Sequence, residues 1–419
     1  MNVHWVFDDT DRWITMSRCP HTTYGDDGHL VSGRFPIANL FHYWRCNWWG
    51  RSDVHWQWSP VADRPNNYAY NIGTWNDAAY WAGWSGNDQG FESWITWLPE
   101  PVLADAQQGR ALLVIDNLNE GFADTRLWQH LHDCCRDWSV PPKSLCFMSG
   151  NLSDPAGYAA WCDAAQISDR ISVIGMPHLM YQQQLVFKQV KTPTWADHEH
   201  LKLHGDRLPL FNCLNRVSRN HRELFMLRLI ERELVTGNLI SHDRLRYHAW
   251  TAHDVPQDLI DRADALLPLI VDDADFNNNK AMQIAPDIYL RSWISVITET
   301  HAWDEPHQLF ISEKLWKPLF ALQPFMVWGH AGTLALLRSW GFETFDCLWD
   351  ESYDHLPDLE RLDAIQHNLA QLRLVRNRWA WLQQAKEICL HNQSWFLAQQ
   401  WFDSTSHGEF MAAYAGLNT

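Results

Sequence analysis

The stretch Leu309–Gly329, LFISEKLWKPLFALQPFMVWG, decides the fold class of this chain. Ser312 is suited to cap a helix, because a serine hydroxyl accepts a hydrogen bond from the free backbone N–H groups of the first turn. Glu313 follows in that turn, where a carboxylate complements the helix dipole. Apolar residues then recur at helical spacing, namely Leu315, Trp316, Leu319 and Phe320. The stretch therefore predicts a helix that begins directly after Ser312.

A buried strand is predicted after this helix. Pro324 ends the helical pattern, and Phe325–Trp328 is a short apolar run that closes on Gly329. A loop, a helix and a strand in this order are typical of an α/β sheet. Glu313 and Lys314 place an acid and a base side by side at the helix N-terminus. Such a pair can hold a nucleotide, with N–H groups and the lysine on phosphate and the carboxylate on ribose hydroxyls, or can serve only as a helix cap.

The first half of the chain alternates strand and helix patterns. Ala111–Asp116 (ALLVID) is a branched apolar run typical of a central parallel strand, and strands are also predicted over 144–148 and 171–175. Helix patterns separate them, over 125–138 and 154–165. This β-α-β-α-β order predicts a Rossmann-like sheet. Residues 1–100 show little periodicity and are expected to be irregular.

The second half repeats the alternation after a polar stretch, 191–206, which is interpreted as a linker. Strands are predicted over 208–214, 238–241 and 293–298, and helices over 219–235, 359–385 and 395–402. The fold class expected is α/β with two Rossmann-like lobes. The domains expected are a Trp-rich N-terminal lobe at 1–205, a second lobe at 206–355 and C-terminal helices at 356–419.

Several segments of the second half resemble one known family. Ile297–Thr300 precedes Ile311–Trp316 and then Gln323–Gly329, and the order is similar to the E-N-S, T-E-K-hydrophobic-W and strand-glycine segments of fucosyltransferase-like glycosyltransferases of the GT-B type. Phe211–Arg222 is similar to the strand and arginine segment that opens the same half-domain. Runs at 337–346 and 350–354 resemble viral and bacterial proteins with this C-terminal half. The resemblance covers roughly 210–355.

The resemblance implies a metal-independent glycosyltransferase in which the second lobe binds a nucleotide-diphosphate sugar. Arginines and Lys314 would stabilise the departing diphosphate, Glu313 would accept the ribose hydroxyls, and Glu299 would contact the donor sugar. Thr300 stands where that family usually has asparagine, which leaves the sugar open. The resemblance also implies that the terminal helices cross back onto the first lobe. The donor-binding residues expected are Arg216, Arg219, Arg222, Glu299, Ser312, Glu313 and Lys314.

An inverting transfer also needs a carboxylate that removes the proton of the acceptor hydroxyl. In the resembling family this base comes from the first lobe. The candidates are Glu120, in the loop after the ALLVID strand, and Asp116 at the strand end. Both are chosen by position alone, because ligands of open α/β sheets bind at the carboxyl ends of the strands. Asp116 can equally be a turn residue that binds its own backbone.

No metal or cofactor is expected beside the nucleotide sugar, which acts as a co-substrate. Asp272, Asp273 and Asp275 form an acidic cluster, and clustered carboxylates bind divalent cations. The cluster precedes a polar, turn-like segment instead of following a nucleotide-binding strand, so a metal role is disfavoured. The histidines form no HExxH motif.

Charge and composition limit the partners. The formal net charge of −17 disfavours nucleic acid and anionic membranes, although a cluster of arginines between residues 216 and 246 leaves nucleic acid open. No apolar run approaches the ~20 residues that span a bilayer. The start lacks a secretory pattern and the nine cysteines lack metal spacing, which predicts a cytoplasmic protein with reduced thiols.

The acceptor is the least defined partner. Tryptophan is enriched to 27 residues, dense around Trp44–Trp58 and Trp75–Trp97, and its flat ring suits stacking on sugars or bases as well as filling a core. The acceptor expected is a glycan or a modified nucleobase. Two alternatives to glycan synthesis stay open: a phage-type glycosyltransferase that modifies a hydroxymethylated DNA base, and a non-catalytic carbohydrate-binding protein on the same scaffold.

Overall fold

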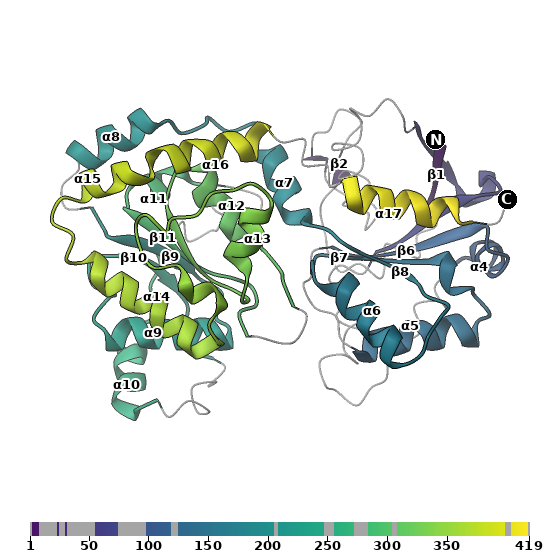
Figure 1. Ribbon diagram of the computed structural model, residues 1–419, viewed down its shortest axis with the longest axis horizontal. Helices are drawn as coiled ribbons and strands as arrows, with labels where there is room; N and C mark the ends of the chain where they lie inside the picture. The colour runs from purple at the N-terminus through teal and green to yellow at the C-terminus, as the bar shows by residue number, and fades with distance from the viewer. Residues whose placement is uncertain are drawn as a thin grey trace. The chain divides into compact units, whose positions relative to one another are not determined.

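The computed structural model describes residues 2–7, 23–24, 30–31, 55–73, 98–118, 125–204, 208–246, 255–271, 284–303, 308–398 and 404–417. They form two compact α/β units, each with its own sheet and helices (Figure 1). The first unit comprises Met1–Tyr181, Pro306–Gln308 and Gln400–Thr419, and the second comprises Gln182–Glu305 and Leu309–Gln399. The fold class predicted from the sequence, α/β with two Rossmann-like lobes, is confirmed.

A six-stranded parallel sheet forms the centre of the first unit, with the order β4-β1-β5-β6-β7-β8. Its central strands are apolar runs buried on both faces, as expected where helices cover both sides of a parallel sheet. A separate antiparallel pair joins β2 (Thr23–Tyr24) and β3 (Leu30–Val31). The strands of the main sheet are β1 (Asn2–Phe7), β4 (His55–Pro60), β5 (Tyr68–Gly73), β6 (Ala111–Asn117), β7 (Leu145–Ser149) and β8 (Ser172–Gly175).

Helices from both ends of the chain cover this sheet. In Figure 1, α5 and α6 lie on one side of it and α17 on the other. The C-terminal α17 packs on β8, the Tyr414 hydroxyl accepts a hydrogen bond from the His4 amide at 2.9 Å, and Phe410 stacks on Trp5. The predicted return of the chain to the first lobe is therefore confirmed for this helix. The helical segments are η1 (Val61–Asp63), α4 (Glu100–Gln107), α5 (Thr125–Asp137), η3 (Pro142–Ser144), α6 (Asp154–Ala164), α7 (His178–Phe187), which continues into the second unit, and α17 (Ser404–Ala415).

The expectation of an irregular N-terminal hundred residues is wrong, because three of the six sheet strands come from it. In β1, Val3, Trp5 and Val6 are buried, and all six residues pair with β4 in parallel register from Asn2–His55 to Phe7–Pro60. β1 (NVHWVF) shows no clean alternation of apolar and polar residues, and the alternation in β4 (HWQWSP) is only six residues long. Their stability comes from partners about fifty residues away, which a local pattern does not report. Most of the Trp-rich segments around Trp44–Trp49 and Trp75–Trp97 lie outside the described residues.

The second unit contains a four-stranded parallel sheet with the order β10-β9-β11-β12. The chain starts at β9, moves to β10 on one side, and then crosses to β11 on the other side. The gap between β9 and β11 is thus the point where the strand order reverses, and ligands of open α/β sheets bind outside the strand ends at such points. The strands are β9 (Phe211–Asn215), β10 (Leu239–His242), β11 (Ile294–Thr298) and β12 (Phe325–Trp328).

Helices lie on both faces of this second sheet. Figure 1 shows α9 and α14 on one side and α11, α12 and α16 on the other, and α16 packs directly on α12. The helical segments are α8 (Trp195–His204), α9 (Asn220–Glu231), α10 (Gln257–Leu266), α11 (Pro286–Leu290), α12 (Glu313–Phe320), α13 (Thr333–Ser339), η5 (Ser352–His355), α14 (Asp358–Leu372), α15 (Arg378–Leu382), η6 (Gln383–Ala385) and α16 (Lys386–Ala398).

Two predicted elements of this unit are corrected by the structure. The segment 191–206, expected as a linker, contains α8, which begins with a reciprocal cap: Thr194 Oγ1 accepts from the Asp197 amide, and Asp197 Oδ2 accepts from the Thr194 amide. The helix expected over 359–385 is divided into α14 and α15. Asn377 caps α15 by accepting from the Ala380 amide at 3.0 Å, so a new helix starts there.

A buried lysine anchors α8 to the amino-terminal edge of the second sheet. Lys202 is 5% exposed, and its ammonium group donates to the carbonyl oxygens of Leu290, at 2.5 Å, and Ser292. It also lies 5.5 Å from the centre of the Trp293 ring. Among the described residues no carboxylate forms an ion pair with it, and burial lowers the pKa of Lys202 to about 7. The ammonium group is thus buried against carbonyl oxygens, with no described carboxylate as its partner.

This burial predicts a stability that rises with pH. Unfolded Lys202 keeps its proton up to its ordinary pKa of 10.5, whereas the folded pKa is about 7. Between these two pKa values the unfolded chain binds more protons than the folded chain, so the free energy of unfolding increases with pH. This increase disappears as the pH falls toward the pKa of folded Lys202. The slope attributable to one lysine is at most about 1.4 kcal/mol per pH unit.

Chemical denaturation of the wild type and of Lys202→Met, at about pH 7 and about pH 8.5, measures this slope. Both pH values lie within the range from the pKa of Lys202 in the folded chain to its pKa in the unfolded chain. We expect the variant to lose most of the rise in stability between the two pH values, because methionine has no proton to release. Equal slopes for the two proteins would show that Lys202 does not titrate in this range.

Candidate functional site

The candidate site lies at the carboxyl ends of β9 and β11, where the strand order of the second sheet reverses. Arg219 and Arg222 follow β9, at the start of α9, and Glu299 directly follows β11. Glu313 and Lys314 form the first turn of α12. Two helix N-termini and the ends of two adjacent strands therefore contribute charged side chains to one edge of the sheet.

Glu299 is the most deeply buried residue of this group. Its side chain is 0% exposed, and Oε2 accepts hydrogen bonds from the amides of Ser312, at 3.1 Å, and Thr300, at 3.2 Å. The other oxygen, Oε1, is buried and has no hydrogen-bond partner among the described residues. Burial raises the pKa of Glu299, and the ammonium group of Lys314 opposes that rise. One oxygen thus holds the chain, and the other remains available to a hydrogen-bond donor.

Gly329 makes room for this carboxylate. It follows β12, next to the strand that ends before Glu299. A Cβ atom placed on Gly329 would lie 3.0 Å from Cγ and 3.3 Å from Cβ of Glu299. Any larger residue at this position would push against the Glu299 side chain, so the glycine that closes the predicted strand has a steric reason.

The first turn of α12 has the cap predicted from the sequence. The Ser312 hydroxyl accepts from the Lys314 amide at 3.4 Å and from the Lys314 ammonium group at 3.2 Å. The ammonium group also donates to Glu313 Oε1 at 2.8 Å and to the Thr300 hydroxyl at 3.3 Å. The side chains of Lys314 and Glu313 keep 22% and 19% of their surface exposed. A ligand can therefore reach both members of this ion pair.

The ion pair determines the charge of both groups. Burial alone would raise the pKa of Glu313, but the adjacent Lys314 outweighs burial and lowers it to about 2. Burial lowers the pKa of Lys314, while Glu313 opposes that change. Glu313 is consequently an ionised carboxylate, which only accepts hydrogen bonds, over the whole physiological pH range.

Arg222 contributes a buried positive charge behind these residues. It is 3% exposed, and its guanidinium group donates to the carbonyl oxygens of Val217 and Glu299, each at 3.1 Å. Burial lowers its pKa to about 10, and the nearby charge of Arg219 adds to that effect. The Nε atoms of Arg219 and Arg222 are buried without a hydrogen-bond partner among the described residues. Two guanidinium groups thus share the site, and no carboxylate of the described part of the chain forms an ion pair with either.

Two histidines of the site are not among the predicted donor-binding residues, although His221 lies in the Phe211–Arg222 segment that carries the resemblance. His221 donates a hydrogen bond from Nε2 to the Glu299 carbonyl oxygen at 2.9 Å, because a carbonyl oxygen can only accept. Burial and the charge of Arg222 lower its pKa to about 3. The ring packs edge-on against Trp303 and Trp328. The other histidine, His301, stacks on His330 with ring centres 6.4 Å apart.

The structure brings together most of the predicted donor-binding residues. Direct bonds join Glu299, Ser312, Glu313 and Lys314, and Arg222 binds the Glu299 carbonyl. Arg216 lies just after β9, and its carbonyl oxygen accepts from the Asp243 amide at 3.2 Å, at the end of β10. The backbone carbonyl of Arg216 therefore pairs on the β10 side of this strand end.

The proposed bases of the first lobe are less defined. Asp116 is the sixth residue of β6, at its carboxyl end as predicted, and only its backbone is described. Glu120 lies outside the described residues, as does the acidic cluster Asp272–Asp275. Within the described part of the chain, no group of three His, Cys, Asp or Glu side chains is arranged to hold a metal ion. Nor does any described helix have the length and apolar character needed to cross a bilayer.

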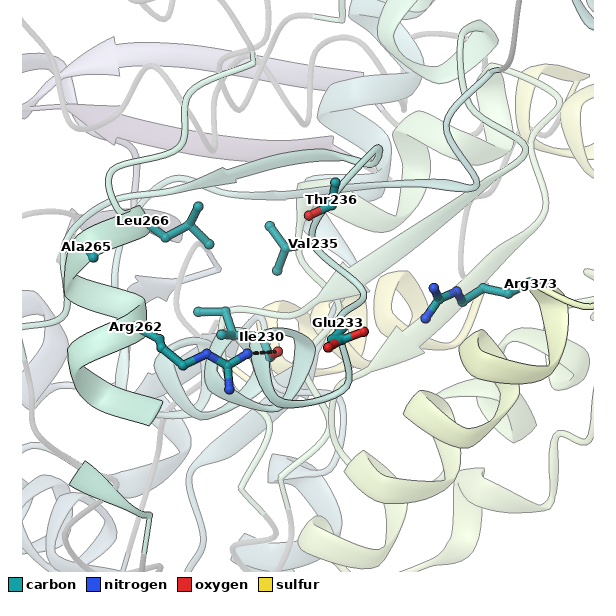
Figure 2. Close-up of a pocket in the computed structure, with 8 residues that line it drawn as sticks. All are labelled: Ile230, Glu233, Val235, Thr236, Arg262, Ala265, Leu266 and Arg373. Atoms are coloured by element: carbon teal, nitrogen blue, oxygen red, sulfur yellow. Dashed lines mark hydrogen bonds between the residues drawn. The ribbon is translucent and has the colours of Figure 1, made fainter. Parts of the chain in front are cut away.

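A surface hollow of about 650 Å³ lies at the opposite edge of the second sheet, where α9 ends and the chain turns toward β10. Figure 2 shows Arg262 and Arg373 on two sides of it, with Glu233 between them. Arg262 donates to the Ile230 carbonyl oxygen at 3.0 Å. These three charged residues are exposed to solvent. Because it lies at the amino-terminal edge, this hollow is separate from the candidate site. Its lining residues are Ile230, Glu233, Val235, Thr236, Arg262, Ala265, Leu266 and Arg373.

Comparison with known proteins identifies distant structural neighbours only. No protein-family model matches the chain, and neither does any curated protein sequence. A GtfA/B complex shares 11% identity over 94% of this chain and 67% of its own, with a TM-score of 0.36. The catalytic domain of starch synthase IV from Arabidopsis thaliana, bound to ADP and acarbose, shares 9% sequence identity over 99% of this chain and 98% of its own chain, with a TM-score of 0.34.

A third neighbour is the UDP-GlcNAc 2-epimerase from Neisseria meningitidis bound to UDP-GlcNAc, with 8% identity over 99% of this chain and 100% of its own, and a TM-score of 0.33. Similarities at this level assign no activity. The fold defines an α/β protein with two Rossmann-like units, and the second unit carries the candidate site.

The geometry around Gly329 gives a test of the buried carboxylate. We expect Gly329→Ala to lower the free energy of unfolding by about 1–3 kcal/mol, because the added methyl group overpacks against Glu299. Gly408→Ala is the matched control: Gly408 is an exposed residue of α17 with no atom within 4 Å of an added Cβ. The control is expected to leave stability unchanged or to raise it by up to about 1 kcal/mol. Denaturant unfolding of both variants measures the difference, and equal effects would contradict the close approach at Gly329.

Proposed function

We propose that this protein is a glycosyltransferase that moves a sugar from a nucleotide-diphosphate sugar to an acceptor hydroxyl without a metal ion. The observation that carries the proposal is the group of cations at the reversal point of the second sheet. Arg219, Arg222 and Lys314 meet there with the ionised Glu313 and the buried Glu299. This set matches the two ends of a nucleoside diphosphate, which are an anionic diphosphate and a ribose diol.

The cations suit the leaving diphosphate. Glycosyl transfer leaves negative charge on the diphosphate, and fixed positive charges aimed at it lower the barrier. Arg219 and Arg222 precede and begin α9, so the positive end of that helix dipole lies beside them. Lys314 lies in the first turn of α12 and adds a second helix N-terminus. In enzymes of this kind such groups do the work that a divalent cation does elsewhere.

Glu313 suits the ribose. It stays ionised at physiological pH, so both of its oxygens accept hydrogen bonds. In the free protein one oxygen binds Lys314 at 2.8 Å. A bound diphosphate would draw the ammonium group toward itself, and that oxygen would then be free to accept from a ribose hydroxyl. The pair thereby exchanges an internal ion pair for two contacts to one ligand.

The acceptor side of the proposal rests on position. Asp116, at the carboxyl end of β6, and Glu120 beyond it are the proposed bases for the acceptor hydroxyl. An aliphatic hydroxyl needs such a carboxylate at the moment of attack, because it is a weak nucleophile while it keeps its proton. The proposed acceptor is a glycan hydroxyl, or a hydroxyl on a modified nucleobase.

The placement of the arginines favours a small anion over a nucleic acid duplex. Three arginines of the predicted basic cluster form ion pairs with acidic residues on the surface. A duplex needs an extended row of unpaired cations, which these pairs do not supply. The pairs are Arg228 with Glu231, Arg232 with Asp363, and Arg246 with Asp243.

Thermal unfolding in the presence of GDP, UDP, ADP, CMP and dTDP tests the binding half of the proposal. A nucleotide that binds only the folded state stabilises it by about 2.7 kcal/mol at a concentration of 100 Kd. We expect one diphosphate to raise the melting temperature, and Lys314→Ala to lose most of that shift. Lys188→Ala is the control, because Lys188 is an exposed lysine of the same unit.

The catalytic half needs a separate measurement. With the sugar diphosphate of the best nucleotide, we expect slow release of free sugar, or transfer to an added acceptor, that is unchanged by EDTA. Binding without any release or transfer would support a non-catalytic carbohydrate-binding protein. No stabilisation by any of the nucleotides in a folded sample would contradict the proposed donor site.

A further inference from the structure

His301 occupies an unusual position in the candidate site. It lies three residues after the end of β11, on the same chain segment as Glu299. Its ring is held between two aromatic neighbours: it stacks on His330, with an angle of 20° between the rings, and meets Phe310 edge-on at 6.0 Å. Its Nε2 atom is buried and has no hydrogen-bond partner among the described residues. A fixed ring with an unused nitrogen at a sheet edge is suited to bind a ligand.

The same histidine is surrounded by positive charge. Burial and then Arg219, His330, Arg222 and Lys314, in that order of effect, lower the pKa of His301 to about 3. These groups come from the segment before α9, from α9 itself, from the loop after β12 and from α12. His221, on α9, also faces it. The acidic groups of the site, Glu299 and Glu313, are engaged with backbone amides and with Lys314. In the free protein the imidazole is therefore neutral.

We propose that His301 is a further binding residue for the diphosphate, that its Nε2 atom donates a hydrogen bond to a phosphate oxygen, and that binding adds a proton to its ring. The inference rests on the proposed function, because it assumes that Arg219, Arg222 and Lys314 hold a diphosphate. Arg219 Nε is, like His301 Nε2, a buried nitrogen without a partner among the described residues. Two unused nitrogens on adjacent elements of one cationic site fit the several acceptor oxygens of a diphosphate.

The proton follows from the charges. The cations that keep the empty site from accepting another positive charge are neutralised when an anion binds to them. The imidazole then loses most of its repulsion and gains a direct anionic partner, and both changes raise its affinity for a proton. The proton comes from the buffer, the ring becomes an imidazolium ion, and no other bond changes. Binding therefore becomes tighter as the pH falls through the imidazole range.

Isothermal titration calorimetry of the tightest nucleoside diphosphate among GDP, UDP, ADP and dTDP tests this inference. Titrations in two buffers of different ionisation enthalpy, at about pH 6 and about pH 8, measure the protons taken up on either side of the ordinary imidazole pKa. The proteins compared are the wild type, His301→Gln and the control His367→Gln. His367 is an exposed histidine of α14 in the same unit. The nucleotide's own titration is the same in all three, so differences between proteins report the imidazole.

At about pH 6, near the ordinary imidazole pKa, we expect the wild type and His367→Gln to take up more protons than His301→Gln. We also expect His301→Gln to bind roughly tenfold more weakly, because it loses a charge-assisted hydrogen bond. Glutamine can still donate a hydrogen bond but cannot take up a proton, so the variant isolates the proton uptake. A fold defect would be seen separately, as a lower melting temperature without nucleotide. Equal proton uptake and affinity in all three proteins would overturn the role of His301 and leave the proposed function intact. If no diphosphate binds the wild type, both proposals fail together.

Discussion

The buried carboxylate of Glu299 is the interaction on which the candidate site depends. One oxygen accepts from the amides of Thr300 and Ser312, which are twelve residues apart, and so ties the end of β11 to the start of α12. A buried carboxylate is tolerated only when hydrogen bonds or opposite charges compensate it, and here two amides and Lys314 do so. Since this contact orients the first turn of α12, it also sets where Glu313 and Lys314 lie. Gly329 leaves space for the Glu299 side chain, because glycine is the one residue type without a Cβ atom.

The site concentrates positive charge in a protein whose formal net charge is −17. Arg222 is held by carbonyl oxygens instead of carboxylates, and its neighbours Arg219, His221 and His301 add no negative charge. Like charges kept together at a buried edge are unfavourable in the empty protein, and an anionic ligand relieves that repulsion. Charge of this kind at a strand reversal point is therefore better explained by a ligand than by stability. The surface arginines further along the chain, by contrast, are paired with acids.

The two edges of the second sheet use polar residues in different ways. At the amino-terminal edge Asn212, Ser292, Ser295 and Gln323 bond to one another in a buried network, and Lys202 binds carbonyl oxygens beside it. Such a network, with its members bonded together, makes the packing specific. At the carboxyl-terminal edge Glu299, Arg219, Arg222 and His301 each keep a buried polar atom without a partner among the described residues. The difference separates a structural network from a binding site within one small sheet.

By itself the sequence determined the local elements of this protein: the Ser312 cap, the helix from Glu313, the strand from Ala111 to about Asp116, the strand at 325–328, and the charged residues that follow β9 and β11. Caps and apolar periodicity act over a few residues, so they can be read without a fold. Only the tertiary structure decided that β1, β4 and β5 complete the first sheet, because their pairing partners are distant in sequence. It alone also placed His221, His301 and Gly329 around Glu299. Their roles arise from packing and shared charge across segments tens of residues apart, and no local pattern carries that information.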